Sequence, residues 1–405
     1  TMYRMFVNVN FSTVNYDLIL VYWESYLQAS FPGGVGYTTN LGVSFNASKY
    51  TCASAAQAAR SSLINTFGWN LTDGGSTCLS ITDFDFYTAV DLWFDNQSLA
   101  EATWGLIGNW NVSAVTDMQA GFFISRSQSV INTFNEDISA WDVSNVTSMN
   151  QMFRGQTTFN QNLSWNTSSV IDMSNMFNDA SSFNSTLTFD TSSVLSMASI
   201  FRKATSFNQP LNWDTSSVTN MIGVFAYATS FNQLLNWDTS SVLTLQQTFH
   251  TATSFNQPLP WDMSSVYNMY QMFYKATSFN QDLSSWDMSN VGSLYETFYK
   301  ATSFNQTLNW DTSSVLNMRN TFAYATSFNQ PLNWDVSSVT VMQGMFSFAS
   351  AFNQPLNWDV SSVTSMSGTF YNVNFSTINY DLILVYWESY LQTAFPGGVG
   401  YTPNI

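Results

Sequence analysis

The chain of 405 residues has few charged side chains, and positive charge is the scarcest. Charged residues make up 9% of it, and 10 Lys and Arg stand against 26 Asp and Glu, for a formal net charge of −16. Nucleic-acid binding depends on clusters of Lys and Arg that contact phosphates. We therefore exclude nucleic acid as a partner. No run of 18 apolar residues occurs either, which excludes a membrane span in this segment.

Residue types that often carry catalysis are scarce as well. His250 is the one His of the chain, and the sequence contains neither a Gly-rich phosphate loop nor a Cys-x-x-Cys motif. A His-based site needs a partner group for the imidazole, and none is evident. Because other repeats carry unrelated residues at this position, we expect His250 to face solvent. We predict that the chain is not an enzyme and holds no resident cofactor.

Only two cysteines are present, Cys52 and Cys78, and both fall in one short segment. A disulfide between them would suit an oxidising compartment, and this pairing is our prediction. Two buried free thiols are the alternative.

Asparagine, by contrast, is abundant, and eleven Asn-x-Ser/Thr sequons occur. Some of these sequons arise by chance in a chain rich in Asn, Ser and Thr. The functional interpretation is N-glycosylation in a secretory pathway, with the protein at the cell surface or outside the cell. The candidate sites are Asn10, Asn46, Asn70, Asn96, Asn111, Asn145, Asn162, Asn166, Asn184, Asn305 and Asn374.

The two ends of the sequence carry the same segment. Residues 1–41 and 365–405 are identical at 31 of 41 aligned positions, so that Asn8 corresponds to Asn372. Internal repeats of this kind decide the architecture of a chain. We expect the chain to be one long unit, residues 1–364, plus an overlap, within a longer protein built from such units.

A shorter repeat fills the region between these copies. The phrase TSFNQPLNWDTSSVTNM, which starts at Thr205, returns with small changes at Thr229, at Thr253 and further along the chain. The Val of this phrase marks eleven coils, and the gap between the first two contains an insertion. The marker residues are Val115, Val146, Val170, Val194, Val218, Val242, Val266, Val291, Val315, Val339 and Val363.

The pattern within one coil predicts a strand and a short helix. Leu211 and Trp213 alternate with polar residues, which is the period of a strand, and the following DTSS offers N-cap oxygens. Val218, Met221 and Phe225 then lie at positions 0, +3 and +7, an apolar stripe of a helix. One coil cannot bury its apolar face alone. We expect eleven stacked coils to form an α/β solenoid, a rod or gentle arc about 50 Å long.

Stacking would turn each repeated position into a ladder. We expect Phe207 and its equivalents to form an aromatic spine, and Asn208 and its equivalents to form a buried amide ladder that ties neighbouring coils together. These ladders are structural by default. In the representative coil they comprise Phe207, Asn208, Trp213, Asp214, Val218, Met221 and Phe225.

The Asp column has two interpretations, because carboxylates in register repel one another if they are unpaired. Each Asp either accepts backbone N–H bonds in its own DTSS turn or shares bound Ca²⁺ with its neighbours. A uniform ladder lacks the differing environments that paired catalytic carboxylates need. The column consists of Asp142, Asp190, Asp214, Asp238, Asp262, Asp287, Asp311, Asp335 and Asp359, with Asn166 at one coil.

The repeat resembles that of a known family. The pattern VTNM..VF..A.SFNQPLNWD is similar to the repeat of BspA-like leucine-rich-repeat surface proteins, including the lipoprotein-associated 25-residue type. The outer phrases NYDLILVYWESYL and ITDFDFYTAVDLWFDNQSLAEATWGLIGNWNVSAVTDM resemble the segments that close one such array and open the next. The resemblance implies a leucine-rich-repeat-like α/β solenoid and an extracellular, surface-associated role. It supplies no catalytic residues.

Residues 11–103 are predicted to form a junction between arrays. Apolar spacing predicts helices over residues 17–27, 54–67 and 82–94, and DGG at residues 73–75 indicates a tight hairpin turn. An open solenoid needs caps at both ends, which this junction would supply. The expected domains are residues 1–10, the end of a preceding array; 11–103, the junction; 104–374, the solenoid; and 375–405, the start of the next junction.

Two functions compete. The long unit, residues 1–364, favours a structural, glycosylated extracellular fibre, such as a flagellar hair or a cell-surface appendage, whose partners are neighbouring repeat units or strands. The alternative is an adhesion module that binds glycan, matrix, mineral or ice through one solenoid face. Regular Thr columns, which include Thr205 and Thr229, would suit that face, although turn hydrogen bonding also explains them.

Overall fold

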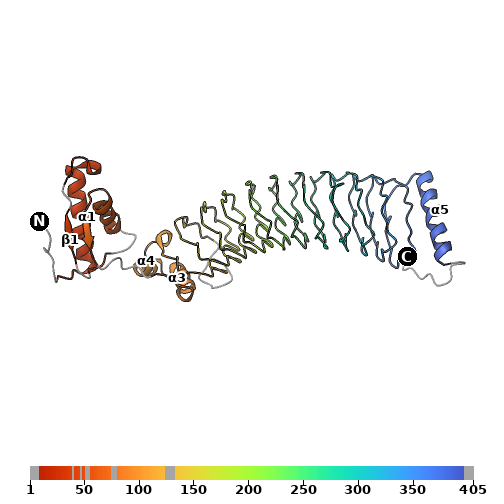
Figure 1. Ribbon diagram of the computed structural model, residues 1–405. Coiled ribbons are helices and arrows are strands. Elements are labelled where there is room, and N and C mark those ends of the chain that lie inside the picture. Colours follow the sequence, from red (N-terminus) through yellow and green to blue (C-terminus); the bar gives the residue numbers. More distant parts are fainter. Residues whose placement is uncertain are drawn as a thin grey trace. The chain divides into compact units, whose positions relative to one another are not determined.

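The computed structural model describes residues 9–38, 41–45, 48–50, 55–73, 80–123 and 133–395. The chain forms two compact units. Unit 1 comprises Thr1–Thr116 and Glu136–Asn145, and unit 2 comprises Asp117–Asn135 and Val146–Ile405. Each unit is described by itself (Figure 1).

The first part of unit 1 is a small module with its own core. Helix α1 (Thr13–Ser30), the 3₁₀ turn η1 (Pro32–Gly34) and helix α2 (Ala55–Asn65) accompany strands β1 (Gly42–Ser44) and β2 (Asn70–Thr72). The helices predicted over residues 17–27 and 54–67 are thus confirmed. The two strands pair in parallel. The tight turn predicted at residues 73–75 falls mostly outside the described residues and stays a prediction. The core gathers Tyr16 and Leu20 of α1 with Phe45 and Leu63.

The second part of unit 1 carries helices α3 (Asp83–Asp95) and α4 (Gln97–Trp104) and the 3₁₀ turn η2 (Ile107–Asn109). Helix α3 begins where the sequence predicted it, after Thr82, which forms a capping box with Asp85. The buried ring of Phe86 lies 6.1 Å from the indole of Trp141, so α3 covers the aromatic side of that coil.

Unit 2 is a solenoid whose coils stack along one direction, from yellow-green to blue in Figure 1. Parallel bridges of a single residue pair join each coil to the next, for example Asn220 to Thr244. The ten marker valines of this unit, from Val146 to Val363, are all buried, at 0–1% exposure. The repeat solenoid expected from the sequence is therefore the architecture of this unit.

The prediction of a short helix within each coil is wrong. Residues 222–227 form turns, in which Gly223 and Tyr227 have positive φ values of 61° and 60°. The N–H groups of Gly223, Phe225 and Tyr227 donate to carbonyl groups one coil further on, at 2.7–2.9 Å. These donors are unavailable for bonds within a helix. The apolar stripe is still buried, because turns that point every third or fourth residue inward produce the same spacing.

The strand predicted within each coil does not form a ladder of hydrogen-bonded pairs with its neighbours. Leu211, Trp213 and Thr215 are buried and the residues between them are exposed, which is the alternation that the sequence predicted. No strand is assigned at these positions within the described part of unit 2, where a single bridge joins Leu163 and Leu187. Neighbouring coils are therefore joined mainly by backbone hydrogen bonds between their turns and by side-chain contacts. With neither helices nor strand ladders in the described coils, the solenoid is not shown to be an α/β structure.

Helix α5 (Thr377–Ala394) is the last described element of unit 2 and covers its last coil (Figure 1). Ser376 caps it by accepting from the N–H of Asn379. The Asn379 amide donates to the carbonyl of Asn353 at 2.7 Å, and Trp387 packs on Phe370 at 5.8 Å between ring centroids. The helix thus ends both the amide ladder and the aromatic columns of the solenoid.

Candidate functional site: repeated columns and the terminal helix

The Phe spine fills the core of the solenoid. Phe207 is fully buried, and its ring stacks on Phe183 at 5.8 Å and on Phe231 at 6.0 Å. A second Phe column interleaves with it, since Phe201 lies 4.0 Å from Phe207. Phe225 belongs to that second column, and Val218 and Met221 are buried beside it.

The Trp column adds hydrogen bonds between coils. The indoles of Trp213 and Trp237 stack at 6.3 Å with planes 2° apart. Trp237, Trp261 and four later indoles each donate their Nε1–H to the backbone carbonyl of a Leu in the preceding coil. Trp213 is the exception, because its buried Nε1 has no hydrogen-bond partner. The preceding coil carries Phe189 where the others carry Trp.

The amide ladder exists, but it is not buried as the sequence suggested. The Oδ1 of Asn208 accepts from the N–H of Asn232 at 2.9 Å, and Asn208 donates its own N–H to Asn184 at the same distance. Asn184 is exposed, and Asn208 and Asn232 are half-buried. The ladder lies at a corner of the coil, where turn backbone would otherwise bond water, so it needs no burial to bind one coil to the next.

Asp214 and its equivalents accept bonds from their own turns. Asp214 Oδ1 accepts from the Ser216 hydroxyl at 2.7 Å and from its N–H at 3.0 Å. These bonds hold the pKa of Asp214 below its usual value, and the opposing effect of the neighbouring carboxylates Asp190 and Asp238 is smaller. Asn166 makes the same pair of bonds with Ser168. Across the described ranges, no three His, Cys, Asp or Glu side chains are grouped as a metal site would need.

His250 does not face solvent as expected. Its side chain is 7% exposed and lies between the rings of Tyr227, at 4.8 Å, and Tyr274, at 4.5 Å. Burial lowers its pKa to about 4, and the positive charges of Arg202 and Lys275 act in the same direction. The ring is flanked by aromatic neighbours in both adjacent coils, which explains why it is covered.

A surface row that the sequence did not suggest runs along the turn edge of unit 2. We call it the aromatic–basic edge. Rings of successive coils meet at 4.5–5.5 Å, as between Tyr274 and Tyr299 at 4.8 Å. Cations lie over these rings, and Lys300 is 4.8 Å from the Tyr324 centroid. The edge consists of Arg154, Arg202, Lys203, Tyr227, His250, Tyr270, Tyr274, Lys275, Tyr295, Tyr299, Lys300, Arg319, Tyr324, Phe348 and Tyr371. The signal available in the sequence was that five of its six Lys and Arg recur at two adjacent coil positions, with Arg319 as the exception.

The Thr column that includes Thr205 and Thr277 uses some of its hydroxyl groups in hydrogen bonds to the backbone of the preceding coil. Thr205 donates its hydroxyl to the carbonyl of Ser181 at 3.3 Å, and Thr277 donates to that of Thr253 at 3.5 Å. A buried Thr column that the sequence did not single out is more regular. Thr215 donates to the carbonyl of Asp238 at 2.8 Å, one coil further on.

The two copies of the repeated helix bury different faces. In α1, Tyr16 and Leu20 are fully buried against the module core. Their copies in α5, Tyr380 and Leu384, are 52% and 49% exposed. In α5 the covered face instead carries Ile383, at 3% exposure, and Trp387. The copies of these two residues in α1, Ile19 and Trp23, are half-buried against the module core. The settings therefore differ mainly at Tyr380 and Leu384, which α5 leaves exposed.

The α1 face also carries a polar network. The Tyr16 hydroxyl donates to Asp73 at 2.6 Å, and Arg60 donates to the same carboxylate at 2.7 Å. Burial, with the hydrogen bond to Asp73, raises the pKa of Tyr16. The Asp73 carboxylate is 2% exposed, so it depends on these donors for its charge.

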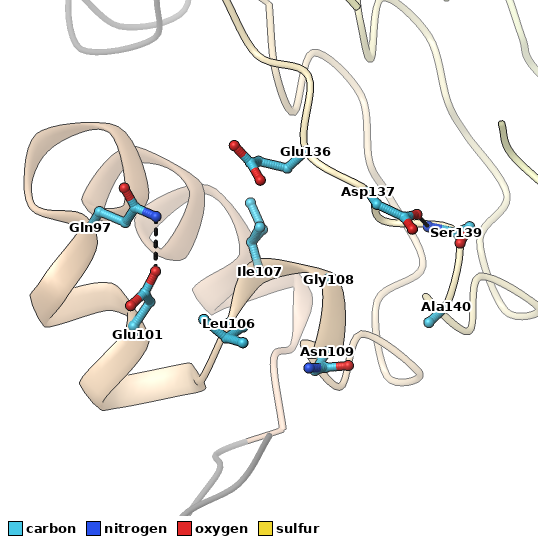
Figure 2. A pocket seen from close by; sticks show the side chains of 10 residues that line it. All are labelled: Gln97, Glu101, Leu106, Ile107, Gly108, Asn109, Glu136, Asp137, Ser139 and Ala140. Atoms are coloured by element: carbon cyan, nitrogen blue, oxygen red, sulfur yellow. Dashed lines mark hydrogen bonds between the residues drawn. The ribbon is translucent and has the colours of Figure 1, made fainter. Parts of the chain in front are cut away.

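A pocket in unit 1 brings several carboxylates together. It has a volume of about 350 Å³ and lies beside α4 and η2. Figure 2 shows Glu101 bonded to Gln97, and Asp137 accepting from the N–H of Ser139 at 2.9 Å. The pocket is lined mainly by acidic, amide and small side chains, and Asp137 and Ser139 are hydrogen-bonded partners within it.

Three sequence-predicted sites lie outside the described residues: Cys52, Cys78 and Asn46. The disulfide therefore remains a prediction. Of the other sequons, Asn305 is half-buried. The exposed ones are Asn10, Asn70, Asn96, Asn111, Asn145, Asn162, Asn166, Asn184 and Asn374.

Comparison with known proteins places the solenoid in a family. A family model described as "Mycoplasma protein of unknown function, DUF285" matches residues 88–212, 163–236, 211–309 and 307–382. The chain belongs to this family. The four overlapping DUF285 matches agree with the BspA-like repeat expected from the sequence, but they do not show a leucine-rich repeat in the strict sense. No curated protein and no solved structure matches the chain.

No helix in the described parts of this DUF285 chain has the length and apolarity to cross a membrane.

Proposed function

We propose that the chain is a repeating unit of a structural, extracellular and glycosylated fibre, in which long units equivalent to residues 1–364 join through the helix represented by α1 and α5. The proposal assigns no catalysis to the chain. The observation that carries it concerns two near-identical helices: α5 exposes Tyr380 and Leu384, whose copies in α1 are fully buried. The copies of Ile383 and Trp387 in α1, Ile19 and Trp23, are only half-buried against the module core.

Combining the two settings gives a joint without a flexible linker. The helix would pack through Ile383 and Trp387 on the last coil of its own array, as α5 does. Through Tyr380 and Leu384 it would pack on the module of the next unit, as Tyr16 and Leu20 do in α1. Full burial of one Leu side chain is worth about 1.5–3 kcal/mol, which is enough to favour a fixed joint.

The polar network supports the same joint. Tyr380 is the copy of Tyr16, whose hydroxyl bonds the buried Asp73 carboxylate. In a joined unit, Tyr380 would donate to the corresponding Asp of the next module. A hydrogen bond to a buried charge also fixes direction, so the angle between units is expected to be uniform.

Exposure of the sequons supports the glycosylation and, with it, the extracellular location. Asn166 and Asn184 use Oδ1 as the acceptor within the solenoid, and these bonds do not involve Nδ2, the atom that carries a glycan. A fibre coated with glycans would keep its flanks solvated despite a charged content of only 9%.

The test is a chain of two successive units, residues 1–364 followed by residues 1–405, viewed by electron microscopy. We expect one narrow distribution of angles between the two arrays. Leu384→Glu should broaden it, because a carboxylate cannot be buried in the module core without a large penalty. Ser389→Glu is the matched control, since Ser389 and its copy Ser25 are both exposed.

A broad distribution in the unmodified chain would contradict the joint, as would an unchanged one in Leu384→Glu. The proposal would also fail if α5 remained as exposed in the two-unit chain as it is at the end of unit 2, which protection of its amides from hydrogen exchange would report.

A further inference from the structure

Positive charge in the described part of unit 2 is confined to one edge. All six Lys and Arg among its described residues belong to the aromatic–basic edge. Several are held over rings, as Arg202 is over Tyr227 at 5.1 Å and Arg319 over Tyr295 at 5.8 Å. Two acidic residues lie among them, since Asp179 approaches Lys203 at 3.8 Å and Glu296 accepts from Gln271. The edge keeps a positive excess in a chain of net charge −16.

Negative charge is arranged in a matching column elsewhere on the coil. Asp190, Asp214 and Asp238 are exposed, and their Ser partners bond Oδ1, which leaves Oδ2 for an outside partner. Tyr227 lies near the midpoint of the sequence between Asp214 and Asp238, the Asp residues of two successive coils. The aspartate column and the aromatic–basic edge are therefore separate surfaces of the same coils.

We infer that the aromatic–basic edge docks on the aspartate column of a second copy of the chain, so that solenoids associate side by side. The inference rests on the proposed fibre and names its lateral partner. Because the two surfaces are different patches of one chain, the contact is heterologous and extends to further copies. It would build a sheet or bundle of strands.

Charge and spacing both favour a second copy as the occupant. Lys275 and Lys300 are one coil apart, as are Asp287 and Asp311. The spacing of the coils is regular here, since successive rings of the Phe column from Phe231 to Phe304 are each 6.0 Å apart. Lys–Asp contacts made at one coil are therefore repeated at the next without strain. The rings hold the cations in place, which reduces the side-chain entropy that an exposed ion pair loses. A flexible polyanion would neutralise the positive charge of the edge, but the spacing of its charges need not match the spacing of the coils.

The experiment measures self-association of the full chain by sedimentation velocity and electron microscopy, at low salt and at about 1 M salt, where the Debye length falls to about 3 Å. The test variants are Lys275→Gln/Lys300→Gln/Arg319→Gln on the edge and Asp287→Asn/Asp311→Asn/Asp335→Asn on the column. Asn keeps the turn bonds, as Asn166 shows. Asp117→Asn/Asp172→Asn/Asp282→Asn makes the same charge change off the column and serves as the control.

We expect side-by-side association at low salt that dissociates at high salt. Either test variant should weaken it about tenfold, since three exposed ion pairs are lost, and the control should not. Laterally dispersed wild-type chains at low salt would overturn the inference. If such chains bind dextran sulfate through the edge, the edge belongs to a polyanion. End-to-end strands without side contacts would refute the lateral docking alone, whereas side contacts without end-to-end strands would refute the fibre.

Discussion

Trp261 donates its indole N–H to the carbonyl of Leu235, one coil earlier, over 3.2 Å. The bond recurs along the column and joins coils at a position where no strand ladder does. Each indole therefore fills the core and satisfies a backbone carbonyl of its neighbour at once.

This relationship predicts that two chemically equal substitutions differ in effect. Trp261→Phe should lower the free energy of unfolding by about 1–3 kcal/mol, because the Leu235 carbonyl loses its partner. Trp213→Phe should cost less, because the buried Nε1 of Trp213 already lacks an acceptor bond. Urea unfolding of both variants measures the difference. Equal losses would show that the indole bond contributes nothing beyond packing.

The aspartate turns predict a contrast between Asn and Ala. Asp214→Ala removes both bonds from Ser216 and should cost about 1 kcal/mol, as for loss of an N-cap, whereas Asp214→Asn should be close to neutral. Thermal unfolding of the two variants at neutral pH tests this. The contrast would be refuted if both variants melted together.

The same bonds set an acid limit for the turns. The pKa of Asp214 is lowered on folding, so its contribution to stability is present above the unfolded pKa of 3.8 and is lost as pH falls through the lower, folded value. The loss of stability on acidification should be small for each turn, because these carboxylates are exposed to solvent.

His250 predicts pH dependence in a higher window. Its pKa falls from 6.5 to about 4 on folding, so the unfolded chain takes up a proton first as pH decreases. Stability contributed by neutral His250 should be complete above pH 6.5 and decline toward pH 4, by about 3 kcal/mol in total. His250→Tyr, which reproduces Tyr274 and Tyr299 of the same column, should abolish this slope. Urea unfolding of the wild type and the variant from pH 7 to pH 4 measures the free energy of unfolding. If its dependence on pH were the same in the variant, His250 would not be the group responsible.

The turn backbone predicts a stabilising change. Ser199 and its equivalents have positive φ, 56° at Ser199, and the same column holds glycine at Gly223, Gly344 and Gly368. Ser199→Gly should raise stability by up to about 1 kcal/mol, because an L side chain is strained in this conformation. Gly223→Val should destabilise by more, because its Cβ would lie 3.1 Å from the Ser199 hydroxyl. Thermal unfolding compares them, and a less stable Ser199→Gly variant would argue against strain.

The sequence predicted the repeat architecture, but not the conformation of its coils. Burial alternates over Leu211–Thr215 and follows the apolar stripe from Val218 to Phe225, and both patterns are visible in the sequence. A helix and a series of turns share that stripe, however. Only the positive φ at Gly223 and Tyr227 separates them, and a Tyr gives no warning of such a conformation.

The site residues divide in the same way. Positions that repeat exactly, such as Phe207 and Trp213, could be placed in ladders from spacing alone. The aromatic–basic edge could not, because its members differ from coil to coil and only stacking brings Tyr227, His250 and Tyr274 into one row. The exposed face of α5 was equally hidden, since α1 and α5 have nearly the same sequence and the same apolar pattern but different neighbours.

Electron microscopy of the native material, with the mass of the reduced, denatured polypeptide, tests the central claim most directly. The fibre account predicts thin filaments whose axial repeat corresponds to one long unit, residues 1–364, and a polypeptide much larger than one unit. Separate particles with the mass of one unit would contradict it, and adhesion would then be the function to test.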